Sequence, residues 1–217
     1  MGVWLEKILD SIYPRLFLCV GCLSEINKGF ICEDCLNDIS FNECLDKKYF
    51  DDFDANYVCY YSGAIKNIIY NFKVHKNFYC GEYLGNILSD YIKKSNLKFD
   101  YLTYVPRDIN KIKKEGFDQS RFLTKFLSKN LNVPFIKVVS CKGKNYDQKR
   151  MGSRDRSLNV KGKFFIEGKL DKLEDKSLLI IDDVATTYST LNEVSKVIKK
   201  SSSKTKVSVL TIAKTLI

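Results

Sequence analysis

Short apolar runs alternate along this chain with longer stretches in which apolar residues recur every three or four positions. The longer stretches predict amphipathic helices over residues 64–74, 78–94, 118–131 and 189–200. The short runs are typical of buried strands, and they occupy residues 57–61, 100–105, 135–139, 178–182 and 206–213. Strands that alternate with helices predict an α/β fold with a mostly parallel sheet covered by helices on both faces.

The pattern at the front of the chain is different. Residues 3–18 have the spacing of a short amphipathic helix, and a cluster of cysteines follows it. Residues 42–56 are rich in Asp, Asn and Lys and have no period, which is typical of a linker. We therefore expect a small N-terminal domain over residues 1–55 and a larger α/β domain over residues 56–217.

The cysteines at the front have the spacing C-x2-C-x9-C-x2-C. Two such knuckles can set four thiolates around one Zn²⁺ ion, so we expect a closed, structural zinc site. Gly21 and Gly29 suit the tight turns of the knuckles. The alternatives are disulfides, or iron in the same sulfur cage, and Cys44 is a further candidate ligand. The expected ligands are Cys19, Cys22, Cys32 and Cys35.

Charge is distributed unevenly along the chain. Residues 1–55 carry eleven acidic and five basic residues, a net charge of −6, so the rest carries +16 of the total of +10. Residues 142–163 alone carry eight basic and two acidic residues and show no period, which predicts a basic loop or mobile hairpin. Such a concentration favours a polyanionic partner, either nucleic acid or a phosphorylated ligand, although a solvated basic surface is the simpler alternative.

Two features bear on where the chain works. Its apolar runs are all shorter than the ~20 residues of a membrane-spanning helix. The N-terminus carries Glu6 early and lacks the basic segment of a secretion signal. We therefore expect a cytoplasmic protein with no membrane span.

The most informative segment follows the apolar run 178–181, where Asp182 and Asp183 stand side by side. The ends of parallel strands are where open α/β sheets bind ligands, and carboxylates suit ribose hydroxyls and Mg²⁺. The next residues, 184–190, supply backbone N–H groups, three Thr hydroxyls and one Ser hydroxyl in front of a helix, as a phosphate site requires. The order of these features predicts a site for a phosphorylated sugar.

Five blocks of this sequence resemble the ComF family, the ComFC-type competence proteins with a phosphoribosyltransferase-like domain. The first is the four-cysteine knuckle, and the last is the Asp-Asp-Val-x-Thr-Thr segment that begins at Asp182. The blocks between them are Tyr61-Ser62-Gly63-Ala64-Ile65-Lys66 with Ile69 and Phe72-Lys73; Val105-Pro106 with Gly116-Phe117-Asp118-Gln119; and Gln148 with Arg154, Arg156, Asn159 and Phe164.

The resemblance implies an α/β domain of the type I phosphoribosyltransferase kind, a parallel sheet flanked by helices, behind a small zinc-binding domain. It implies that Asp182 and Asp183 bind the ribose of phosphoribosyl diphosphate, with Mg²⁺ bridging ribose and diphosphate. The 5′-phosphate would lie on the loop of Ala185, Thr186, Thr187, Ser189 and Thr190. The diphosphate loop would be Pro106-Arg107, and the basic residues that close over the site would be Lys149, Arg150, Arg154 and Arg156.

The resemblance further implies a role in natural transformation, in which the competence machinery takes up DNA. We therefore expect a competence accessory protein that binds a phosphoribosyl diphosphate-like ligand and handles single-stranded DNA, with Tyr146, Phe164 and Phe165 stacking bases. One alternative is an active phosphoribosyltransferase acting on a nucleobase or a related acceptor. Another is a zinc-knuckle interaction protein with a vestigial pocket. Catalysis is left open because Tyr188 stands where the superfamily loop has Gly.

Overall fold

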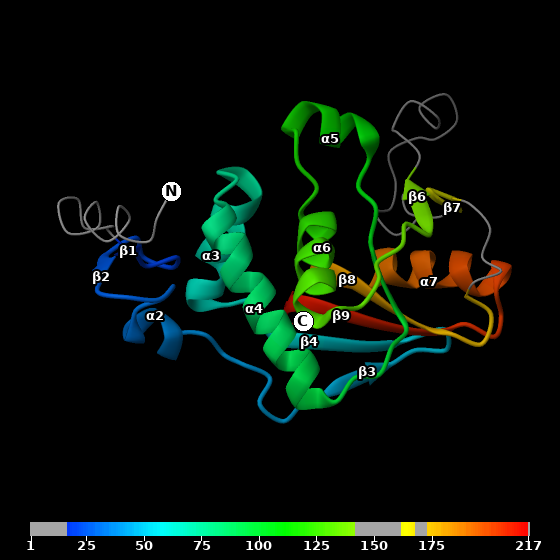
Figure 1. The fold of residues 1–217 in the computed structure, drawn as a ribbon, viewed down its shortest axis with the longest axis horizontal. Coiled ribbons are helices and arrows are strands. Elements are labelled where there is room, and N and C mark those ends of the chain that lie inside the picture. Colours follow the sequence, from blue (N-terminus) through cyan, green and yellow to red (C-terminus); the bar gives the residue numbers. More distant parts are fainter. Residues whose placement is uncertain (1–16, 142–161, 168–172, 217) are drawn as a thin grey trace, which may run out of the picture.

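The computed structural model describes residues 17–141, 162–167 and 173–216 (Figure 1). Its centre is a five-stranded sheet in the order β3-β4-β9-β8-β5. β3 is antiparallel to β4, and the other neighbours are parallel, which confirms the predicted mostly parallel sheet. The bounds of these strands are Lys47–Tyr49 for β3, Asp54–Tyr60 for β4, Tyr101–Tyr104 for β5, Ser177–Ala185 for β8 and Lys206–Lys214 for β9.

The predicted amphipathic helices are confirmed, with ends that differ by one residue from the expected ones. The short helices α2 and α5 have no counterpart among the predictions. Within the part of the chain that the structure describes, no helix is long and apolar enough to cross a bilayer. The helices are α2 (Glu33–Asn37), α3 (Gly63–Val74), α4 (Phe78–Ser95), α5 (Ile109–Glu115), α6 (Gln119–Leu131) and α7 (Ser189–Ser201).

Both faces of the sheet are buried, because alternate residues of β8 pack on opposite sides. Leu179 and Ile181 belong to a core cluster with α3, α4 and α6. Leu178 and Ile180 belong to a second cluster with α7. Figure 1 shows α3, α4 and α6 gathered together, with α7 set apart from them. This accounts for the unbroken apolar run in the sequence, since a strand buried on both faces has no polar side.

The predicted linker over residues 42–56 is wrong, because these residues contain β3 and the start of β4. Asn42 anchors the segment: its amide nitrogen donates to the carbonyls of Asp46 and Tyr57, each at 3.0 Å, and its side-chain oxygen accepts from the Asp46 N–H at 2.9 Å. β3 is a three-residue edge strand with every residue exposed, so it carries no apolar alternation that a sequence pattern could reveal.

Two other expected elements need correction. Residues 135–139 form no continuous strand: Phe135 makes a single parallel bridge to Leu102, and the next strand, β6, begins at Val139. β6 (Val139–Cys141) pairs antiparallel with β7 (Phe164–Ile166), so Cys141 and Phe164, which flank residues 142–163, lie opposite each other. The helix expected over residues 3–18 lies mostly outside the described residues, and its last two, Phe17–Leu18, form strand β1 instead.

The cysteine segment packs directly on the α/β part of the chain. β1 pairs with β2 (Glu25–Ile26) to form the first knuckle. Val20 and Ile39 are buried in the same core cluster as α3 and α4. The division into domains at residue 55 stays a prediction. Removal of residues 1–55 would expose the apolar surface that Val20 and Ile39 cover on α3 and α4.

Candidate functional site

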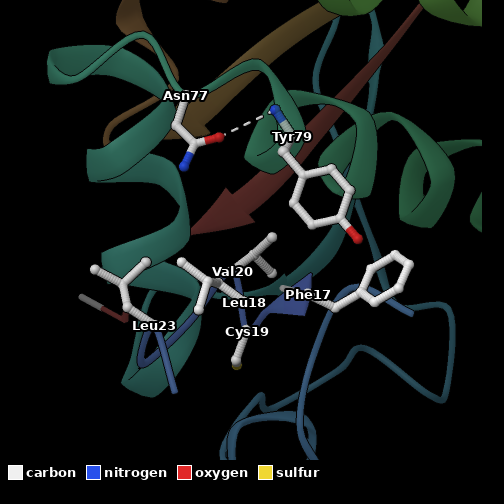
Figure 2. Close-up of a pocket in the computed structure, with 7 residues that line it drawn as sticks. All are labelled: Phe17, Leu18, Cys19, Val20, Leu23, Asn77 and Tyr79. Carbon is white, nitrogen blue, oxygen red and sulfur yellow. Dashed lines mark hydrogen bonds between the residues drawn. The ribbon is translucent and has the colours of Figure 1, made fainter. Parts of the chain in front are cut away.

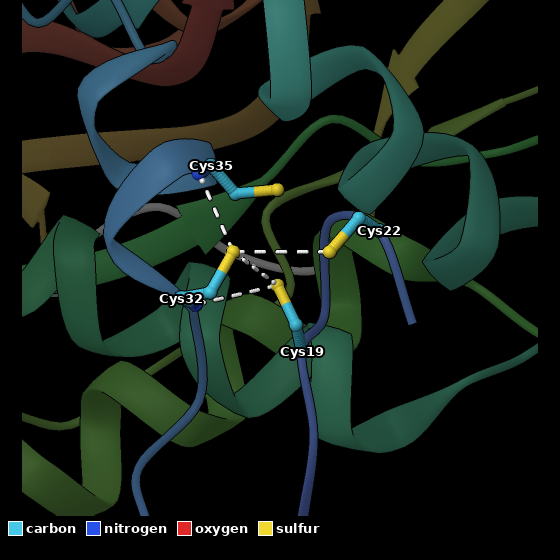
Figure 3. A group of neighbouring side chains, drawn as sticks. All are labelled: Cys19, Cys22, Cys32 and Cys35. Carbon is cyan, nitrogen blue, oxygen red and sulfur yellow. Dashed lines mark hydrogen bonds between the residues drawn. The ribbon is translucent and has the colours of Figure 1, made fainter. Parts of the chain in front are cut away.

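The four predicted zinc ligands form one cluster. All four Sγ atoms lie within 4.8 Å of one another, and Figure 3 shows them facing a common centre. Cys32 Sγ lies 3.6 Å from Cys19 Sγ and 3.7 Å from Cys22 Sγ. A tetrahedral ZnS4 site with Zn–S bonds of about 2.3 Å requires sulfur separations of roughly 3.8 Å. The cluster therefore fits a structural zinc ion, whereas Cys44 is exposed and stands outside it.

Hydrogen bonds around the first knuckle favour the thiolate form of Cys19 and Cys22. The N–H groups of Gly21 and Cys32 donate to Cys19 Sγ at 3.4 and 3.3 Å. The Ser24 hydroxyl, 2.8 Å from Cys22 Sγ, lowers the pKa of that thiol to about 6. Burial raises the pKa of Cys35, and the neighbouring cysteines act in the same direction. Four thiolates so close together repel one another, and a divalent cation removes that repulsion.

Gly21 is required for a reason other than the one that the sequence suggests. Its backbone conformation is not unusual, but a Cβ at this position would lie 2.8 Å from Cys35 Sγ. Gly29 is the reverse case, with φ at +84° and open space around it. Gly21 therefore allows close approach of the two knuckles, and Gly29 allows a turn.

Aromatic contacts fasten the second knuckle to α4. The rings of Phe30 and Tyr79 stack with centroids 4.5 Å apart, and the Tyr79 hydroxyl donates to the Gly29 carbonyl at 2.6 Å. A hollow of about 400 Å³ lies beside this contact (Figure 2). It is lined by Phe17, Leu18, Cys19, Val20, Leu23, Asn77 and Tyr79. Its lining is mostly apolar and includes no Asp or Glu, so this hollow lacks the carboxylates that a phosphosugar site needs.

The acidic pair lies inside strand β8, which continues for two residues beyond Asp183, and not at the strand's end as the sequence pattern predicts. The apolar run stops at Ile181, but pairing with β9 continues to Ala185. On the other side, pairing with β5 ends where Ile181 meets Tyr104. Asp182 and Asp183 therefore stand just beyond the end of β5, at the edge of the sheet where parallel α/β folds bind ligands.

Asp182 is half-buried and is held by α6. The Ser120 hydroxyl donates to Asp182 Oδ1 at 2.8 Å, and the Asp183 N–H donates to the same oxygen at 3.0 Å. Burial raises the pKa of Asp182 to about 7, the Asp183 charge acts in the same direction, and the Ser120 hydrogen bond opposes both. Two adjacent carboxylates offer the hard oxygen ligands that Mg²⁺ prefers, so these residues fit that cation.

Asp183 is paired with a cation from α3. Lys73 Nζ lies 2.7 Å from Asp183 Oδ2, and the two side chains are 34% and 15% exposed. The sequence shows Lys73 within one of the blocks that resemble the ComF family, but nothing in its local pattern points to the acidic pair. Ser120 is a second contact that sequence reasoning missed, and it directly follows the block that ends at Gln119.

The expected diphosphate loop directly follows β5. Arg107 donates to the Gln119 side-chain oxygen at 2.9 Å and, more weakly, to the Phe117 carbonyl at 3.4 Å. Asp118 caps α6 by accepting from the Arg121 N–H at 3.1 Å. The residues from Pro106 to Ser120 therefore link the loop after β5 to Asp182 through the start of α6.

The expected 5′-phosphate loop is shorter than the sequence suggests. Ala185 is buried and belongs to β8, whereas Thr186 and Thr187 are exposed. Thr187 Oγ1 lies 2.9 Å from Ser189 Oγ, at the N-terminus of the 13-residue helix α7, whose first turn includes Thr190. Helix N-termini attract phosphate because their N–H groups are unpaired and the dipole is positive.

Tyr188 has a left-handed backbone, the conformation that Gly adopts most readily, with φ at +59°. Its ring is 5% exposed and packs on Phe50, with centroids 5.2 Å apart, in the core beneath α7. Burial raises the pKa of Tyr188 to about 12. The ring is therefore part of the core that packs against α7, and the left-handed backbone at Tyr188 is the conformation that Gly would allow there.

The remaining sequence predictions concern the basic segment. Lys149, Arg150, Arg154 and Arg156 lie outside the described residues, as does Tyr146. Phe164, expected as a base-stacking residue, is buried in the core under α7, so this prediction is wrong. Phe165 is 43% exposed, so its proposed stacking on a base stays a prediction.

No protein-family model matches the chain. Solved structures to which the chain is similar include adenine phosphoribosyltransferase from Thermoanaerobacter pseudethanolicus, at TM-score 0.42 and 16% identity, covering 65% of this chain and 83% of that one. Another is a hypothetical protein from Neisseria gonorrhoeae with bound ppGpp, at TM-score 0.41 and 15% identity, covering 64% and 69%.

In sequence, the chain is 25% identical over 197 residues to Competence protein F of Haemophilus influenzae, and the match covers 84% of each chain. The four-cysteine cluster, which is one of the blocks that resemble the ComF family, forms in the structure as the sequence predicts. This chain is therefore similar along most of its length to a competence protein, in agreement with its resemblance to the ComF family.

Proposed function

We propose that this chain is a ComF-type competence accessory protein that binds phosphoribosyl diphosphate, or a similar phosphosugar, at the sheet edge formed by β5 and β8. The observation that carries the proposal is the position of Asp182 and Asp183, just beyond the end of β5. Carboxylates in that position can accept hydrogen bonds from ribose hydroxyls, and Mg²⁺ would neutralise the ligand's diphosphate when bound.

Two neighbouring features support a phosphorylated ligand. The N-terminus of α7, with Thr187 and Ser189, offers backbone N–H groups and hydroxyls to a phosphate. Arg107 brings a guanidinium to the loop after β5, where the diphosphate would lie. In this proposal Thr186 and Thr190 complete the 5′-phosphate site. Lys149, Arg150, Arg154 and Arg156 would close over the diphosphate.

The second part of the proposal is that the chain handles single-stranded DNA in the cytoplasm during natural transformation. The support is the similarity to a competence protein and the net charge of +16 over residues 56–217. Among the described residues, α5 contributes three exposed lysines to this charge, Lys111, Lys113 and Lys114. A positive surface binds the phosphate backbone with strong salt dependence.

Calorimetric titration with phosphoribosyl diphosphate, with and without Mg²⁺, tests the sugar site. The expected result is saturable binding that Mg²⁺ strengthens, and no binding under either condition contradicts the proposal. Titration of a fluorescent single-stranded oligonucleotide between 50 and 300 mM salt tests the DNA part, for which we expect affinity to fall steeply with salt, by on the order of tenfold or more. Binding that does not respond to salt, or no binding at low salt, would contradict it.

A second candidate function is transfer of phosphoribosyl to or from a nucleobase. Two cations favour it, because a departing diphosphate needs positive charge. They are Lys73, which is paired with Asp183, and Arg107, which lies in the loop after β5. Release of diphosphate from phosphoribosyl diphosphate in the presence of a panel of nucleobases separates the two functions. A chain that binds the ligand but releases no diphosphate acts as a binding protein.

A further inference from the structure

The ion pair between Lys73 and Asp183 joins the end of α3 to the acidic pair. Its Nζ–Oδ2 distance is 2.7 Å, and both side chains are more than half buried. A pair that is partly shielded from water is screened less than a surface pair and holds a defined geometry. In the free chain Lys73 is therefore held at the sheet edge next to Asp183.

The helix that carries Lys73 is firmly anchored. Phe72, the preceding residue, is fully buried. The centroid of its ring lies 5.1 Å from that of Phe117 and 5.3 Å from that of Phe122. Lys73 lies in the last turn of α3, where the helix dipole favours a cation. Binding of a ligand would therefore reorient the flexible lysine side chain while its helix stays in place.

A ligand at this edge would bring its own charges. Ribose hydroxyls that donate to Asp183 leave its charge in place, while the diphosphate adds several negative charges nearby. An ammonium group has three N–H donors, so it can contact a carboxylate and a phosphate oxygen at the same time. Because Lys73 lies 2.7 Å from Asp183, it can contact the diphosphate of a ligand whose ribose binds Asp183.

We propose that Lys73 is a diphosphate-binding residue, which pairs with Asp183 in the free chain and donates to the diphosphate of a bound phosphoribosyl ligand. This inference rests on the proposed sugar site. It adds to the expected diphosphate loop a cation from a different element, α3, more than thirty residues earlier in the chain. The rival is a purely structural role, in which Lys73 only fixes the orientation of Asp183.

Two ligands separate these roles. Phosphoribosyl diphosphate and ribose 5-phosphate share the ribose and the 5′-phosphate, but only the first carries a diphosphate. A residue that contacts the diphosphate affects only the first ligand, whereas a residue that only orients Asp183 affects both. The test is calorimetric titration of each ligand, with Mg²⁺, into wild type, Lys73→Met and Lys73→Arg. Lys66→Met is the matched control, since it removes an exposed lysine from the same helix.

For Lys73→Met we expect binding of phosphoribosyl diphosphate to weaken about ten- to hundredfold, as for the loss of a charged hydrogen bond. Binding of ribose 5-phosphate should change by less than about twofold, and Lys73→Arg should restore most of the lost affinity. Equal weakening of both ligands, or no weakening of either, overturns the inference. Wild-type protein that binds neither ligand overturns the proposed sugar site itself, which is a separate result. Thermal unfolding of each variant confirms that it is folded.

Discussion

The hydroxyl of Ser120 donates a 2.8 Å hydrogen bond to Asp182, and so connects the N-terminus of α6 to the acidic pair in β8. Thr124 donates in turn to the Ser120 carbonyl at 2.7 Å, one helical turn further on. Because α6 packs against both β5 and β8, this connection fixes Asp182 relative to the loop after β5. The proposed site is therefore built from elements that are already held in position.

Asp182 should make stability depend on pH. Its pKa in the folded chain is about 7, above its ordinary value of about 4, so the folded chain binds more protons between these values. The free energy of unfolding therefore falls as pH rises from about 4 to about 7. Asp182→Asn should remove this fall and be more stable than wild type at pH 8, by on the order of 1–2 kcal/mol.

Urea unfolding at pH 5 and pH 8 measures this difference. Asp90→Asn, which replaces an exposed carboxylate on α4, is the control and should follow wild type. If Asp182→Asn is less stable than wild type at pH 8, burial does not disfavour the charged form of Asp182 and the prediction is wrong.

Tyr188 should stabilise the fold and have little effect on phosphate binding. Its hydroxyl is buried with no hydrogen-bond partner among the described residues, so Tyr188→Phe should raise stability by about 1 kcal/mol. Tyr188→Gly should lower the free energy of unfolding by about 3 kcal/mol through the lost ring packing and raise it by about 1 kcal/mol through relief of left-handed backbone strain. The net loss of stability is therefore about 2 kcal/mol. Urea unfolding measures both changes. A Gly variant more stable than wild type would show that the ring contributes little to the core.

The cysteine cluster should hold one zinc ion per chain, and the metal should stabilise the N-terminal segment. Cys32→Ser removes a ligand that lies within 3.7 Å of two other sulfurs, so this variant should purify without stoichiometric zinc. Cys44→Ser removes an exposed thiol outside the cluster and should keep the metal. Metal analysis with a count of reactive thiols is the measurement, and a zinc-free wild type with disulfides would contradict the assignment.

Gly21 and Gly29 offer a matched pair for the geometry of the knuckles. An alanine Cβ at Gly21 would crowd Cys35 Sγ, whereas the same change at Gly29 meets open space and adds only backbone strain of about 1 kcal/mol. Gly21→Ala should therefore lower the affinity for zinc about tenfold or more, and Gly29→Ala should lower it much less, as measured by competition with a chelator. Equal zinc affinity in the two variants would mean that the knuckles adjust to the extra methyl group.

The main helices were predictable because their apolar spacing is regular over three or more turns. The end of β8 was not, since two aspartates interrupt its apolar run while the backbone continues its pairing with β9. The cysteine cluster could be predicted from spacing alone, because short knuckles bring their own ligands together. The contacts of Lys73 and Ser120 with the acidic pair could not, because they join residues 110 and 62 positions apart and depend on how the helices pack on the sheet.

The most direct test of the proposed function is calorimetric titration of phosphoribosyl diphosphate with Mg²⁺ into wild type and into the Asp182→Asn, Asp183→Asn double variant. Each carboxylate lost removes a charged acceptor for the ribose and the cation, so we expect saturable binding by wild type and a loss of about hundredfold in the double variant. Equal affinity of the two proteins, or no binding by wild type, would contradict the account.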